Sequence, residues 1–164
     1  MRLLRHMFSP SVRRLFPESS LDRIAAQVGA GEMRHSGQVV FAVEADMPLW
    51  QVWRGVQAPA RAREVFARLG VWDTEANNGV LIYLLLADHR IEIVADRGLR
   101  DRVDSARWRQ VCALIEEGMR AGQAEQAVLE GGRAVSDVLS EHFPRMEAEP
   151  GIDELSNHPR VLRK

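Results

Sequence analysis

The sequence predicts an α/β protein built as a three-layer α/β/α sandwich, in which helices flank a small mixed β-sheet. Short apolar segments rich in β-branched residues alternate with segments whose apolar residues recur at helical spacing. A helical pattern over residues 49–69 separates the first two strands, and such a crossover favours parallel neighbours with a right-handed connection. Only residues 87–90 separate the second strand from the third, so we expect those two strands to pair antiparallel.

The first helix is expected to begin near Ser19 or Ser20 and to continue to about Arg34. Its apolar face is formed by Leu21, Ile24, Ala25 and Val28. The first strand follows at residues 38–44. Because this segment is apolar on both faces, it is typical of a strand in the interior of a sheet.

Two helices are expected in the crossover that follows the first strand. Residues 49–56 have the pattern of a short helix, and Pro59 suits the first turn of the next one. Gly70 is a natural residue just beyond the C-terminus of that second helix. Residues 71–76 then form a loop that leads to the second strand.

The second and third strands are expected to form a hairpin. Residues 80–86 are apolar on both faces, so this strand should lie at the centre of the sheet. In the third strand, Ile91 and Ile93 alternate with Glu92, which is the pattern of a strand at the edge.

Two long helices complete the predicted domain, at residues 105–121 and 123–142. Gly122 separates them, and Pro144 stops the second. Cys112 is the only cysteine in the chain, which excludes an intrachain disulfide and any metal site made of several cysteines. We expect its thiol to be buried and unreactive.

The sequence divides into a basic N-terminal arm at residues 1–15, a single domain at residues 16–144 and a flexible C-terminal tail at residues 145–164. The arm has four arginines among apolar residues, and no acidic residue precedes Glu18. Either the arm lays its apolar residues on the domain, or it forms a helix that docks on a membrane surface or on a partner. The apolar residues of the tail that are candidates for docking are Ile152, Leu155, Val161 and Leu162.

The composition excludes several classes of function. The chain is 46% hydrophobic and 27% charged, and its net charge of -1 gives no general attraction to nucleic acid. The longest uncharged apolar run, residues 80–87, is too short to span a bilayer, and the N-terminus lacks the pattern of a signal peptide. We therefore expect a cytoplasmic protein without a transmembrane segment, with peripheral membrane association as the alternative. The phosphate-binding, nucleophile-elbow and HExxH metal motifs are absent from the sequence.

The predicted hairpin brings polar loops together at one end of the sheet. Its turn is expected to centre between Asp88 and His89, which places Val80 near Arg97. The residues expected to converge there as oxygen ligands of a divalent cation are Asp73, Asn77, Asn78, Asp96 and Asp101. Calcium is the expected ion, and Arg97 and Arg100 would form a clamp for phosphate beside it. The alternative is that the Asn-Asn-Gly sequence only forms a turn, because asparagine and glycine tolerate positive φ.

Three sequence features occur together at a characteristic spacing. They are residues 61–70, residues 77–81, and residues 90–93 with Gly98-Leu99 downstream. With that spacing they resemble the TPM domain family over about residues 16–143. The family includes a thylakoid-lumen acid phosphatase, photosystem II repair proteins and a modulator of nematode acetylcholine receptors. The resemblance implies an α/β/α sandwich, calcium binding at the sheet-end loops and, in some members, weak phosphatase activity. The residues that match the family's pattern are Asn77, Asn78, Gly79, Gly98 and Leu99.

Two functions are compatible with these observations. The first is an accessory module that binds a membrane-protein complex or another envelope partner through the N-terminal arm or the C-terminal tail, with a calcium site at the sheet-end loops. The second is a weak, metal-dependent acid phosphatase that acts on phosphomonoesters. We favour the binding module, because no nucleophile can be named from the sequence.

Overall fold

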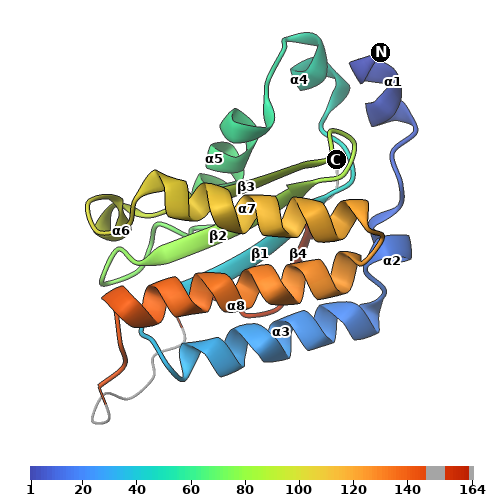
Figure 1. The fold of residues 1–164 in the computed structure, drawn as a ribbon. Helices are drawn as coiled ribbons and strands as arrows, with labels where there is room; N and C mark the ends of the chain where they lie inside the picture. Colours follow the sequence, from blue (N-terminus) through green and yellow to red (C-terminus); the bar gives the residue numbers. More distant parts are fainter. Residues whose placement is uncertain (147–153, 163–164) are drawn as a thin grey trace.

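The sheet has four strands in the order β3-β2-β1-β4, and helices cover both of its faces (Figure 1). The computed structural model describes residues 1–146 and 154–162. This architecture confirms the predicted α/β/α sandwich with a mixed sheet and adds a fourth strand.

Two parallel strands, β1 (Gln38–Glu44) and β2 (Gly79–Leu85), form the centre of the sheet, and every residue in both is buried. β3 (Arg90–Ala95) pairs antiparallel with β2, and most of its residues are only partly buried. The predicted centre and the predicted edge are therefore both confirmed. Both predictions rest on the same physical rule: a strand covered by helices on both faces needs apolar residues at nearly every position, whereas an edge strand does not.

The predicted register of the hairpin is wrong by two residues. Val80 pairs with Ala95 and not with Arg97, so the turn centres between Ala87 and Asp88. The reason lies in the neighbouring strand: the Leu86 and Ala87 N–H groups donate to carbonyls at the end of β1, at 3.0 and 2.9 Å. These bonds hold the chain against β1 up to Ala87, and the reversal occurs there.

The fourth strand, β4 (Arg160–Leu162), pairs parallel with β1 at the edge opposite β3. It lies within the segment predicted as a flexible tail, and three residues are too few to give a strand pattern in the sequence. Leu155 and Leu162 pack against the core, as their apolar character indicated. Ile152 lies outside the described residues, as does the rest of the segment 147–153.

The helices form two layers with separate cores. On one face lie α3 (Glu18–Glu32), α7 (Ser105–Arg120) and α8 (Ala124–His142), and on the other lie α4 (Leu49–Trp53) and α5 (Ala58–Arg68) (Figure 1). A short helix that the sequence did not predict, α6 (Arg97–Arg100), follows β3. Two further short helices, α1 (Arg2–Met7) and α2 (Val12–Leu15), form the N-terminal arm.

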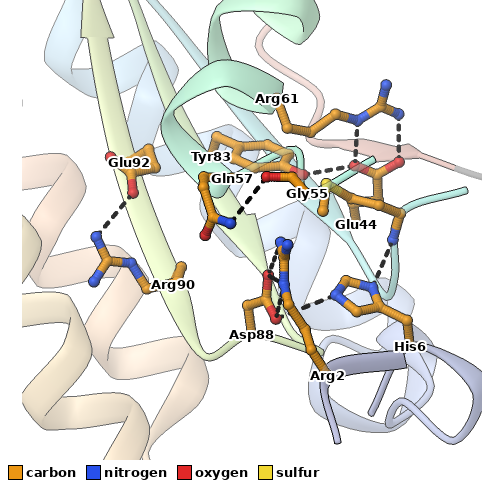
Figure 2. A network of polar contacts seen from close by, with 11 residues as sticks. Arg2, His6, Glu44, Gly55, Gln57, Arg61, Tyr83, Asp88, Arg90 and Glu92 are labelled. Atoms are coloured by element: carbon orange, nitrogen blue, oxygen red, sulfur yellow. Dashed lines mark hydrogen bonds and ion pairs between the residues drawn. The ribbon is translucent and has the colours of Figure 1, made fainter. Parts of the chain in front are cut away.

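A buried ion pair joins the end of β1 to α5 (Figure 2). Arg61 donates to both carboxylate oxygens of Glu44, at 2.9 and 2.6 Å, and the two residues are only 3% and 1% exposed. The Tyr83 hydroxyl, from β2, donates to the same carboxylate at 2.6 Å. Burial raises the pKa of Tyr83, so its phenol remains a neutral donor. Both carboxylate oxygens of Glu44 therefore receive hydrogen bonds within the core, and Arg61 balances the negative charge.

Polar side chains also hold the N-terminal arm on the domain (Figure 2). The His6 ring is buried; its Nδ1 accepts from the Met47 N–H at 3.0 Å, and its Nε2 lies 3.2 Å from Asp88. Arg2 binds the same aspartate at 2.6 Å. Further along the arm Val12 is buried in the core. The arm therefore packs on the domain, but α1 does so mainly through polar residues.

Two glycines lie where backbone segments meet at the other end of the sheet. A Cβ on Gly79 would overlap the Val71 carbonyl oxygen. A Cβ on Gly98 would lie 2.6 Å from the Asn77 carbonyl oxygen. Both positions therefore require glycine because the loop before β2 passes directly over them.

We predict that Arg61→Ala lowers the free energy of unfolding by about 3–5 kcal/mol, because it leaves the Glu44 carboxylate buried without its cation. Tyr83→Phe removes one donor and should cost about 1–2 kcal/mol. Urea unfolding measures both, and Arg63→Ala, an exposed arginine of the same helix, is the control. A loss below about 1 kcal/mol for Arg61→Ala would contradict the assignment.

We also predict that Gly98→Ala and Gly79→Ala each destabilise the fold by about 1–3 kcal/mol, because the new methyl group meets backbone that must move. Gly29→Ala is the matched control. A Cβ there meets only the end of the Asn157 side chain, at 3.4 Å, and alanine is the better helix residue. Thermal unfolding should separate the two classes, and equal stability of Gly98→Ala and the wild type would contradict the close approach.

Candidate functional site

The start of β2 and the end of β3 lie at the same end of the sheet, and the loops that continue them meet there. The Asp96 N–H donates to the Gly79 carbonyl at 2.9 Å, and the Gly98 N–H donates to the Asn77 carbonyl at 2.9 Å. The structure therefore brings Asn77, Asn78 and Asp96 together at this end, as predicted, although the register that was expected to do so was wrong.

Asn77 and Arg97 bind each other. Asn77 has the left-handed conformation, with φ of 51°, and its side-chain Oδ1 accepts from Arg97 Nε at 2.8 Å. This contact joins the loop before β2 to α6. The predicted cation ligand and the predicted phosphate clamp are thus engaged with one another in this structure.

Asp96 is the N-cap of α6. Its Oδ1 accepts from the Arg97 N–H at 2.7 Å, which satisfies one of the free donors at the start of that helix. The residue is 8% exposed, and its Oδ2 is buried without a hydrogen-bond partner. A buried carboxylate oxygen without a donor is unusual in a native protein and calls for an explanation.

Asn78 is a second residue at this end of the sheet with a buried, unpartnered side-chain oxygen. Its backbone N–H donates to the Thr74 hydroxyl at 3.1 Å, and its side-chain nitrogen lies 3.5 Å from the Ser36 hydroxyl. The residue is 1% exposed, and its Oδ1 is buried without a partner. Two oxygen acceptors from the ends of adjacent strands are therefore buried and unsatisfied.

The other predicted residues are exposed. Asp73 lies in the loop after α5, and Arg100 and Asp101 lie at the end of α6. Within the described residues, the single close group of three histidine, cysteine or acidic side chains is Glu18, Asp22 and His158. That group is exposed and belongs to α3 and the segment before β4. The described residues therefore do not place three carboxylates together at the predicted site.

His35 precedes β1 at this end of the sheet, but it is fully enclosed. Its Nδ1 donates to the Gly37 carbonyl at 3.0 Å, and its Nε2 has no partner. Burial lowers the pKa of His35 to about 4, so the ring is neutral at physiological pH. Cys112 also lacks reactive character, because burial raises the pKa of its thiol to about 11.

The polar network at the opposite end of the sheet, formed by Glu44, Arg61 and Tyr83, was not predicted from the sequence. A signal was present, since Glu44 and Tyr83 carry polar groups within strands made mostly of apolar residues. Each carboxylate oxygen in that network has a donor, so the network stabilises the core and leaves no free acceptor for a ligand.

Comparison with known proteins agrees with this fold. The chain superposes with a TM-score of 0.79 on the NMR structure of the BA42 protein from the psychrophilic bacterium Bizionia argentinensis. The two chains are 24% identical, and the match covers 92% of this chain and 98% of the other. No curated protein sequence gives a significant match. A family model of the TPM domain matches residues 12–138, which include the arm's second helix, the three longer strands and most of α8. The chain therefore belongs to the TPM domain family.

Proposed function

We propose that this TPM domain is a binding module that holds a divalent cation, such as calcium, at the loops around Asn78 and Asp96. The observation that supports the proposal is the buried, unpartnered Oδ2 of Asp96, which lies at the same end of the sheet as the buried, unpartnered Oδ1 of Asn78. Carboxylate and amide oxygens are the ligands that calcium prefers in proteins. A cation is a natural partner for an oxygen that receives no hydrogen bond.

Asp96 is the principal ligand in this proposal. Its Oδ1 is fixed by the cap of α6, which holds the carboxylate in place and leaves Oδ2 for the ion. Calcium takes six to eight oxygens, so water and neighbouring groups complete its coordination. Asp73 and Asp101, both exposed at the same end, are the acidic residues available to add charge.

Binding is better supported than phosphatase activity. In the described part of the chain, Arg97 is engaged with Asn77, and His35 is enclosed and unable to exchange protons with a substrate. A phosphatase needs a nucleophile or an activated water beside groups that stabilise the transferred phosphoryl charge. No contact among the described residues provides an activated nucleophile at this end.

We predict that Asp96→Asn weakens calcium affinity at least about tenfold, because it removes the charge of the proposed principal ligand. Asparagine is also a good N-cap, so α6 keeps its start. Calcium titration followed by two-dimensional NMR measures the affinity, with shifts expected at residues 73–79 and 96–101. Asp104→Asn is the matched control, since Asp104 is the exposed N-cap of α7.

Equal calcium affinity of Asp96→Asn and the wild type would contradict the proposed ligand. Absence of any shift at millimolar calcium would exclude the site altogether. Turnover of a phosphomonoester on the same sample, dependent on the metal and lost in Asp96→Asn, would instead favour the phosphatase.

A further inference from the structure

Exposed apolar side chains gather on two short helices of the domain. α1 and α4 contact each other at the end of the sheet opposite the proposed cation site (Figure 1). The exposed residues are Leu3, Leu4, Met7 and Phe8, at 41%, 57%, 57% and 79%, and Leu49, Trp50 and Trp53, at 41%, 56% and 79%. We call these residues the α1–α4 surface. Large apolar side chains gathered on adjacent elements are uncommon on a monomer and usually mark a contact site.

Buried and partly buried polar residues on the inner faces of both helices fix this surface. α1 has only six residues, too few to be stable alone, and it is held by His6 and Arg2 (Figure 2). α4 is held by Gln51, which is 4% exposed and donates to Glu64 at 3.0 Å. Polar anchors, together with the buried Val52 of α4, thus face the domain, while the seven large apolar residues of the α1–α4 surface are exposed.

The exposed charged side chains on and next to the two helices are arginines, whereas Asp46, Glu64 and Asp88 nearby are bound by Ser9, Gln51 and Arg2. Arg5 and Arg54 are exposed, and the Arg54 guanidinium lies over the Trp50 ring, 5.3 Å from its centroid. Arg13 and Arg14 follow in α2. Neither α1 nor α4 contains an acidic residue. This local positive charge contrasts with the net charge of -1 of the whole chain. Tryptophan and other apolar side chains beside arginine are typical of helices that lie in the interface of an anionic membrane.

We propose that the α1–α4 surface docks the protein on an anionic lipid bilayer. Phe8, Trp50 and Trp53 enter the boundary between headgroups and acyl chains, and Arg5 and Arg54 contact the lipid phosphates. Among the described residues, none of the helices combines the length and the hydropathy that a membrane span needs. The proposal is independent of the cation site, which lies at the other end of the sheet.

The test uses the full chain in EDTA, sedimented with vesicles of phosphatidylcholine alone or of equal parts phosphatidylcholine and phosphatidylglycerol. Binding to the anionic vesicles is expected to be at least about tenfold tighter, to weaken with salt, and to shift tryptophan fluorescence to the blue. The double variants Phe8→Ser/Trp53→Ser and Arg5→Gln/Arg54→Gln should each bind at least about tenfold more weakly. All four side chains are exposed, so both variants should fold as the wild type does.

Trp72→Ser and Met33→Ser are the matched controls, because these residues are 54% and 75% exposed but lie outside the surface. Unchanged binding in both controls, with loss in both double variants, supports the proposal. It is overturned if the wild type sediments with neither vesicle or if Phe8→Ser/Trp53→Ser binds normally. It is also overturned if the wild type is a dimer that Phe8→Ser/Trp53→Ser makes monomeric, because a second copy would then cover the surface.

Discussion

The parallel pairing of β1 with β2 is the contact on which the rest of the structure depends. Both strands are buried along their whole length, so each face of the pair must be covered. That requirement places α3, α7 and α8 on one face and α5 on the other. It also sends the polar residues to the two ends of the strands, where the chain leaves the core.

Buried polar groups have hydrogen-bond partners at one end of the sheet and lack them at the other. At the end near α1, Glu44 lies deep in the core, yet its carboxylate receives donors from Arg61 and Tyr83. At the other end, Asp96 and Asn78 each keep a buried oxygen without a donor. An unpartnered buried acceptor lowers stability, whereas a satisfied one does not. The contrast is the physical reason for giving the first end a structural role and for proposing a ligand only at the second.

The residues that match the TPM pattern have mainly structural roles in this chain. Gly79 and Gly98 make room for the loop that crosses them, and Leu99 is fully buried. Asn77 adopts the left-handed backbone that the turn requires. Asn78 alone in this set has a side-chain oxygen without a partner. A match to the TPM pattern therefore indicates mainly the geometry of the loops at the strand ends. It indicates the chemistry of a site only indirectly, through that geometry.

The sequence by itself determined the fold class, the central and edge strands and the place where polar loops meet, because these follow from hydrophobic periodicity and from the lengths of the connections. It did not determine the register of the hairpin, since the turn at Ala87 is set by hydrogen bonds to β1. Nor did it determine β4, whose three residues form a strand only because β1 offers a free edge. The tertiary structure also decided which acids are buried: Asp96, the N-cap of α6, is buried, while Asp73 and Asp101 remain in solvent. Burial and pairing across distant segments depend on contacts that no local pattern records, and they decide where a ligand can bind.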